Sequence, residues 1–339
     1  MTVGATLVGS LLVTLDRPRT WPLALATFLL RGGILLVLAP IVVLPSAVSM
    51  GNVLTPLLST VVFQGLTPSV VLLLTAVVGV GLLWLIGAGL VSSAAEAAMV
   101  VEVAADDETW PAGRPPRDPQ TVGRAAWRVL VVRLIALVPL AIALSWGAVR
   151  IVAVAYRELT VPSDVDVALV VRVAGGATDA VVVVLVAWLV GEAVSAIAAR
   201  RVVLFGDGVV RALRGGVARL VWHPLRTIML AALPIVPLGL VLSGVGLAGS
   251  ATWNALRTAL TFGDERLMAL VLLLALVVLF AGGLLLIGVT SAWRGAIWTI
   301  EVAGTFGATQ HDPEGPWIGA GDSGTLGDLR PRGVDPDTR

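Results

Sequence analysis

The chain has 339 residues, of which 57% are hydrophobic and 13% are charged, and its formal net charge is +1. This composition excludes an ordinary soluble globular protein, and the near-neutral charge gives no reason to expect nucleic acid as a partner. The absence of cysteine and the presence of only two histidines exclude disulfides, thiolate metal sites and multi-histidine metal sites. We therefore expect no metal and no cofactor.

The longest uncharged stretch of the chain indicates the class of protein. From Gly32 to Ala95, 64 consecutive residues carry no ionisable side chain. A bilayer core about 30 Å thick is crossed by roughly 20 apolar residues of helix, so this stretch provides most of two crossings and the turn between them. Prolines and amides between residues 40 and 68 mark the turn. The sequence predicts an all-α, polytopic membrane protein.

The crossings can be placed in chain order. The first 15 residues are apolar and lack the basic region of a signal peptide, which predicts a retained amphipathic helix ahead of the first crossing. Six longer apolar segments follow, and each can cross a bilayer as a helix. They lie at about 22–47, 69–100, 128–155, 167–199, 226–248 and 267–300. We therefore expect six transmembrane helices in a domain that covers residues 1–303.

The connections between the crossings are short. Residues 103–126 are rich in Pro and Arg and predict a linker, whereas 203–223 predict a Gly-Asp-Gly turn followed by a basic amphipathic helix. Two segments on the opposite side, 52–64 and 252–262, predict short apolar helices at the membrane surface. The residues at 304–339 are rich in Gly, Asp and Pro, which predicts a disordered cytoplasmic tail.

The distribution of arginine predicts the orientation. All basic residues are Arg, and before the tail 13 of them lie on one side of the predicted crossings and four on the other. Because basic residues concentrate on the cytoplasmic side of membrane proteins, both termini are expected in the cytoplasm. The sequence therefore predicts a multi-pass protein of the cell (inner) membrane.

The three pairs of crossings share a spacing that suggests an internal repeat. A residue at the start of each odd crossing is followed 61 or 63 residues later by a similar string in the even crossing. These pairs are Trp21 with Trp84, Trp127 with Trp188, and Trp222 with Leu285, and the positions twelve residues after the first members are Gly33, Pro139 and Pro234. The pattern predicts three helical hairpins, at about 1–104, 121–205 and 206–303, in a pseudo-threefold bundle. Chance matching in apolar sequence is the alternative.

Charged residues deep inside the crossings form the first candidate site. Arg31 lies about ten residues into the first crossing, while Arg172 and Asp179 lie seven residues apart on one face of the fourth. Charges at such depth are costly and often functional. We expect Arg31 to pair with Asp179 across helices. The pair either locks the bundle or forms an ion- or substrate-coupled site.

Two further groups of charged residues lie near the cytoplasmic ends. Glu96, Glu192 and Arg294 occupy similar positions on the three even crossings and predict a ring of charge that either gates the bundle, binds a headgroup or anchors the helices at the interface. Arginines on the predicted amphipathic helix are candidates for contact with lipid headgroups, although topology alone also explains them. They are Arg211, Arg214 and Arg219.

Two strings carry a resemblance to known proteins. The string from Ala199 to Gly216 (ARRVVLFGDGVVRALRGG) and that from Asn52 to Gly65 (NVLTPLLSTVVFQG) resemble a broad group of uncharacterised prokaryotic multi-pass membrane proteins. That group is similar to the membrane domain attached to some glycerophosphodiester phosphodiesterases. The resemblance covers most of residues 1–304 and implies an all-helical, lipid-associated membrane module. The sequence shows no hydrolase domain, so neither activity nor functional residues carry over.

The sequence favours a non-enzymatic function. No Walker loop, HExxH motif or nucleophile elbow is present, and two histidines provide few means of acid–base catalysis. The leading hypothesis is a lipid-associated scaffold or accessory protein whose partners are membrane lipids and a second copy or another membrane protein. The alternative is a small secondary transporter or permease that uses the intramembrane arginines and aspartate.

Overall fold

The computed structural model describes residues 2–40, 63, 65, 67–105, 119–161, 163–164, 166–262 and 266–310. The regular structure in these ranges is helical, as predicted. The elements are α1 (Val3–Asp16), α2 (Thr20–Phe28), the wide turn η1 (Leu29–Gly33), α3 (Ile34–Leu38), α5 (Pro68–Ala104), α6 (Pro119–Ala136), α7 (Val138–Thr160), α8 (Leu169–Gly176), α9 (Thr178–Phe205), α10 (Val209–Trp222), α11 (Pro224–Ala232), α12 (Ile235–Phe262) and α13 (Arg266–Gln310).

Six helical segments of the described chain are long and apolar enough to cross a membrane. They are Thr20–Leu38, Pro68–Ala104, Val122–Thr160, Thr178–Phe205, Pro224–Thr261 and Arg266–Thr305. Many large apolar side chains on these segments, such as Leu72, Leu83 and Leu274, are exposed at the protein surface. Such a surface suits lipid rather than water, because the hydrophobic effect would bury it in a soluble protein. The chain is therefore a multi-pass membrane protein.

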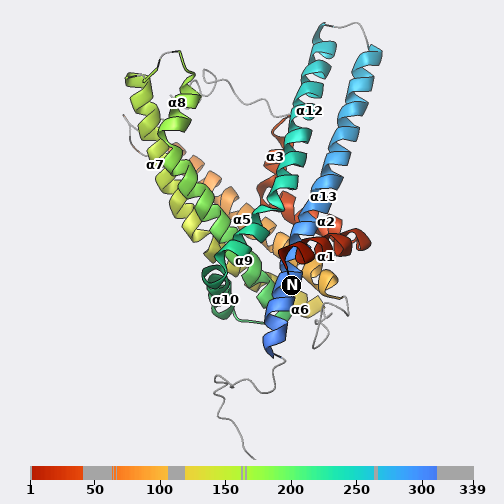
Figure 1. Cartoon of the computed structure of the whole chain (residues 1–339). Helices are drawn as coiled ribbons and strands as arrows, with labels where there is room; N and C mark the ends of the chain where they lie inside the picture. Colours follow the sequence, from red (N-terminus) through yellow and green to blue (C-terminus); the bar gives the residue numbers. More distant parts are fainter. Residues whose placement is uncertain are drawn as a thin grey trace, which may run out of the picture.

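The helices pack closely at one end of the bundle and spread apart at the other (Figure 1). The closely packed end contains α10, the start of α6 and the end of α13, and we call it the α10 end; the tips of α8, α12 and α13 mark the opposite, α8 end. The main buried core lies in the closely packed half and includes Val100, Val129, Ile197 and Trp298. As a result, side chains on α5 between Val71 and Ile86 are exposed around most of the helix.

Each odd crossing is interrupted near the position that the predicted repeat singles out. In η1, Arg31 leaves helical geometry and Gly32 takes a left-handed conformation (φ +99°), which glycine adopts without steric strain. The break between α6 and α7 precedes Pro139, and the break between α11 and α12 contains Pro234, as expected where proline removes a backbone donor. The threefold repeat itself stays a prediction.

Two helices lie across the bundle instead of along it (Figure 1). The predicted lead-in helix is α1, which packs on α13: the indole Nε1 of Trp293 donates to Leu7 O at 3.2 Å and to Ser10 Oγ at 3.1 Å. The predicted turn and basic helix are also confirmed, since Gly206 is left-handed (φ +69°) and α10 follows. Small residues of α10 are buried against α9, where the backbone of Gly216 approaches Val194 closely.

Two predictions about the connections are wrong in the described part of the chain. Residues 252–262 are the last turns of the continuous helix α12, because the apolar pattern of the fifth crossing simply continues through them. The expected disorder from residue 304 is wrong up to Gln310, where α13 ends. Nearly all of 52–64 and the middle of 103–126 lie outside the described residues.

Candidate functional site

A single buried carboxylate joins four segments of the bundle. Glu96 of α5 is only 1% exposed and accepts hydrogen bonds from three arginines. Arg31 Nη2 of η1 lies 2.5 Å from Oε2, Arg133 of α6 binds both carboxylate oxygens at 2.5 and 2.8 Å, and Arg200 Nη1 of α9 lies 2.6 Å from Oε1. Charge-assisted and bidentate contacts of this kind are the strongest hydrogen bonds in proteins. Glu96 thus fixes η1, α6 and α9 relative to α5.

A second ion pair extends the site to α13. Arg294 Nη2 of α13 lies 2.8 Å from Glu192 Oε1 of α9. Glu192 is also within electrostatic range of Arg31 and Arg133. We call these six residues the arginine–glutamate cluster: Arg31, Glu96, Arg133, Glu192, Arg200 and Arg294.

Hydroxyl and carbonyl groups of the neighbouring helices orient the arginines. Arg31 Nε donates to Ser92 Oγ at 2.9 Å, one turn before Glu96 on α5. Arg200 Nη1 also donates to Ala196 O at 3.2 Å, and its Nη2 donates to Gly295 O at 3.4 Å. The interruption at η1 and these local acceptors help to bring side chains from five segments together.

The cluster carries more positive charge than negative. Its four arginines are permanently protonated, and two ionised glutamates leave an excess of +2. Four guanidinium groups offer about twenty N–H donors, whereas two carboxylates accept about eight hydrogen bonds. An uncompensated charge inside a membrane protein costs several kcal/mol, so the surplus favours an anion from outside the chain.

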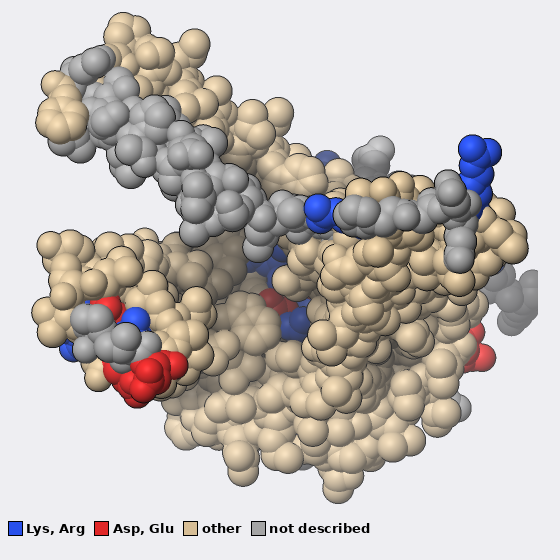
Figure 2. Space-filling model, turned by 90° about the horizontal axis from the view of Figure 1, so that it is seen from above, with Lys and Arg blue, Asp and Glu red and all other residues tan. Residues whose placement is uncertain are grey.

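The cluster is open towards one end of the bundle. The side chains of Arg31, Glu192 and Arg294 are 29%, 22% and 20% exposed, whereas those of Arg200 and Glu96 are 4% and 1% exposed. Seen from the α8 end, the molecule has a hollow between its spread helices, with basic and acidic atoms at the floor (Figure 2). Towards the α10 end, α5 and α6 continue into the buried core. Among the described residues, the spread half is therefore the open side of the site.

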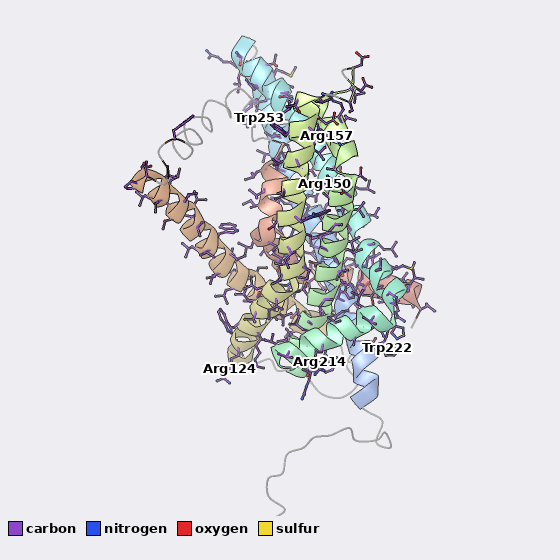
Figure 3. The ribbon with its side chains drawn as sticks, turned by 90° about the vertical axis from the view of Figure 1, so that its left-hand side faces the viewer. Arg124, Arg150, Arg157, Arg214, Trp222 and Trp253 are labelled. Atoms are coloured by element: carbon purple, nitrogen blue, oxygen red, sulfur yellow. The ribbon has the colours of Figure 1, made fainter. Side chains whose placement is uncertain are left out.

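The predicted pair between Arg31 and Asp179 is wrong. Asp179 lies in the first turn of α9, roughly 20 Å along the helix from Glu192, and pairs with Arg150 Nε at 3.1 Å. Arg172 donates to Asp164 O at 2.5 Å in the same outer region. Figure 3 shows Arg150 on the outer part of α7, well away from the α10 end. Asp179 was expected deep inside the fourth crossing, but it lies at the end of α9 because that helix begins only one residue earlier.

The predicted ring residues do lie in one part of the bundle, but they do not form a simple ring. Glu192 pairs with Arg294, while Glu96 binds arginines of other helices. The sequence alone did not select Arg133 or Arg200, since an arginine near a helix end also fits the ordinary topological pattern. The sequence signal for this part of the site was the position of Glu96 near the cytoplasmic end of its crossing.

The predicted headgroup arginines of α10 have different surroundings. Arg219 Nη2 is bound to Glu301 Oε1 at 2.6 Å and therefore helps to hold α10 on α13. The side chain of Arg211 is 80% exposed, with Asp207 at 4.0 Å, and Arg214 points away from the spans (Figure 3). The last two remain available to lipid headgroups.

A small pocket beside Arg219 does not compete with the cluster as a ligand site. It is lined in part by Thr227, Trp298 and Glu301, and its volume of about 10 Å³ suits a single water molecule. The described residues also contain no group of three acidic or histidine side chains that could hold a metal.

Comparison with known proteins identifies no relative of this chain, so its function is argued from the site. No family model, no curated protein and no solved structure matches this chain.

Proposed function

We propose that this protein is a non-enzymatic, lipid-associated scaffold or accessory protein that holds the anionic headgroup of a membrane lipid at its arginine–glutamate cluster. The observation that carries the proposal is the surplus of +2 inside the bundle. Charged atoms are also visible at the floor of the hollow between the spread helices (Figure 2). An anion that neutralises this charge stabilises the folded bundle, since buried like charges repel.

The surroundings of the cluster favour an amphiphile over a soluble anion. The helices beyond the cluster expose Val and Leu side chains, including Leu82 of α5, Val186 of α9 and Leu286 of α13. A lipid with its headgroup at the cluster and its acyl chains directed towards the α8 end would match charge with charge and apolar surface with apolar surface. With the predicted orientation, such a lipid belongs to the cytoplasmic leaflet.

The test compares lipids that remain bound to two charge-reduced variants after gentle purification. Arg31→Gln removes an exposed positive charge from the cluster, while Glu96 retains Arg133 and Arg200 as partners. We expect native mass spectrometry to show several-fold less bound anionic phospholipid than in the parent protein. Arg150→Gln, which removes an equal charge from an exposed pair outside the cluster, should retain the parental amount.

Equal lipid retention by the parent protein and Arg31→Gln, or parent protein free of phospholipid, would contradict lipid binding at the cluster. The resemblance to the membrane domain of glycerophosphodiester phosphodiesterases also supports the proposed lipid-associated scaffold, because it implies lipid association.

A small secondary transporter or permease is the second candidate. The opening of the described bundle towards the spread half is the observation that favours it, since a transporter closes one end of its central site while the other is open. Reconstituted protein that exchanges a soluble anion across lipid vesicles, with the exchange lost in Arg31→Gln, would support transport and displace the scaffold.

A further inference from the structure

We infer that the arginine–glutamate cluster selects a phosphate monoester, which carries up to two negative charges, over a phosphodiester, which carries one. The inference rests on the proposed function and adds the chemical class of the headgroup. It starts from the charge of the cluster, where four arginines and two glutamates leave +2.

Charge balance gives the first argument. A phosphate monoester carries about −1.5 to −2 near pH 7, so one such group neutralises most of the surplus. A phosphodiester carries a single charge and leaves about +1 inside the bundle. Because uncompensated charge in this environment is costly, the monoester is the better complement.

The hydrogen-bonding groups of the cluster give the second argument. In the described part of the chain, Arg31 uses Nε for Ser92 and Nη2 for Glu96, and no contact involves its Nη1. Arg200 Nε is buried and lacks a hydrogen-bond acceptor among the same residues, whereas Arg294 Nη2 is engaged by Glu192 Oε1 at 2.8 Å. Arg31 and Arg200 therefore each retain an N–H group without an acceptor among the described residues. A monoester presents three terminal oxygens as acceptors to the arginines of the cluster, whereas a diester presents two.

The buried glutamate holds the arginines without taking the place of the ligand. Glu96 is 1% exposed and binds Arg31, Arg133 and Arg200 from the interior of the bundle. The side chains of Arg31 and Arg294, in contrast, remain 29% and 20% exposed. A fixed set of guanidinium groups binds an anion at lower entropic cost than mobile side chains do.

The experiment measures binding of three lipids with identical acyl chains to the full-length protein. The lipids are phosphatidic acid, a monoester; phosphatidylglycerol, an anionic diester; and phosphatidylcholine, a zwitterionic diester. We expect native mass spectrometry to show at least tenfold preference for phosphatidic acid over phosphatidylglycerol. Arg31→Gln and, as a second and independent variant, Arg294→Gln should each reduce this ratio towards one, while Arg150→Gln preserves it.

The possible results separate the inference from the function on which it rests. Equal binding of phosphatidic acid and phosphatidylglycerol overturns the monoester preference but leaves lipid binding intact. Absence of binding by all three lipids overturns both. Inorganic phosphate serves as a competitor that distinguishes a lipid headgroup from a soluble phosphate as the ligand. Displacement of phosphatidic acid by an equal concentration of phosphate supports a soluble phosphate ligand and overturns the lipid headgroup. Failure of phosphate to displace the lipid supports the lipid headgroup.

Discussion

At the scale of single residues, Glu96 is the most consequential side chain of the described structure. It is buried, and three arginines from separate segments converge on its two carboxylate oxygens. Removal of one partner from a buried ion pair is far more damaging than loss of an exposed pair, because the remaining charges stay desolvated. Here the remaining charges would be three arginines held close together.

Glu96→Gln is therefore expected to destabilise the bundle strongly. Loss of a partner from a buried ion pair costs about 3–5 kcal/mol, whereas exposed pairs contribute about 0–1 kcal/mol. The thermal unfolding temperature of purified Glu96→Gln should fall well below that of the parent protein. Asp179→Asn breaks the exposed pair with Arg150 and is the matched control, with a melting temperature close to that of the parent.

Addition of Arg31→Gln to Glu96→Gln should recover part of the lost stability, since it removes one of the arginines left without a counter-charge. An unchanged melting temperature in Glu96→Gln would refute the central role of this carboxylate.

At the scale of the helices, three glycines in similar sequence strings differ in how closely a neighbouring helix approaches them. Gly87, Gly191 and Gly288 occupy the same place in the strings WLIG, WLVG and LLIG. An added Cβ at Gly191 would lie 2.8 Å from Ala136 O, and one at Gly288 would lie 3.2 Å from Trp21 O, but one at Gly87 would meet nothing within 4 Å. These positions therefore pack differently: close backbone contact requires glycine at Gly191, leaves little room for a Cβ at Gly288 and sets no such limit at Gly87.

Substitution of these glycines by alanine tests the difference. Gly191→Ala forces α6 and α9 apart against backbone atoms and should cost about 1–3 kcal/mol, the usual range for overpacking. Gly87→Ala places its methyl group in open space and should leave the thermal unfolding temperature unchanged or slightly raised, since alanine favours helix. Equal melting temperatures for the two variants would show that the close approach of α6 and α9 is absent in solution.

The arginines of α10 and α11 do not form one uniform lipid-binding surface. Arg219 and Arg226 both bind Glu301 of α13, each at 2.6 Å. Arg211 and Arg214, in contrast, lie on the outer side of α10. The outer arginines suit contact with headgroups, whereas the inner arginines attach the helix and its successor to the bundle.

At the scale of the whole molecule, the two ends of the bundle differ in packing and charge. The α10 end contains the main core and the basic helix α10, whereas the α8 end is spread and carries ion pairs such as Arg150 with Asp179. The distribution of arginine predicts that the α10 end faces the cytoplasm. In this predicted orientation the hollow seen from the α8 end opens away from the cytoplasm (Figure 2).

The orientation can be tested with single cysteines, because the natural chain has none. Asp166→Cys lies in the described part of the connection between α7 and α8, and Ala218→Cys lies on the exposed side of α10. A membrane-impermeant maleimide should label position 166 in intact cells and position 218 only after permeabilisation. The reverse pattern would invert the topology, and labelling of both positions in intact cells would contradict the span between them.

Much of the fold could be predicted from particular residues. The uncharged stretch from Gly32 to Ala95 and the Gly-Asp-Gly turn before α10 led directly to crossings and connections that the structure contains. Part of the site was also accessible, since Arg31, Glu96, Glu192 and Arg294 were singled out by their depth or position. The partners were not: Asp179 was chosen for Arg31, and Arg133 and Arg200 were assigned to topology.

The sequence by itself determined that the protein lies in a lipid bilayer, that it is helical and approximately where it crosses. The reason is that the free energy of transfer into lipid and the need to satisfy backbone hydrogen bonds act on each segment locally. Only the tertiary structure decided which charges meet. An ion pair depends on the depth, rotation and tilt of two helices that are distant in sequence, and those are set by packing at places such as Gly191 and by the interruption at η1. The surplus of arginine around Glu96 became visible only when these helices were brought together.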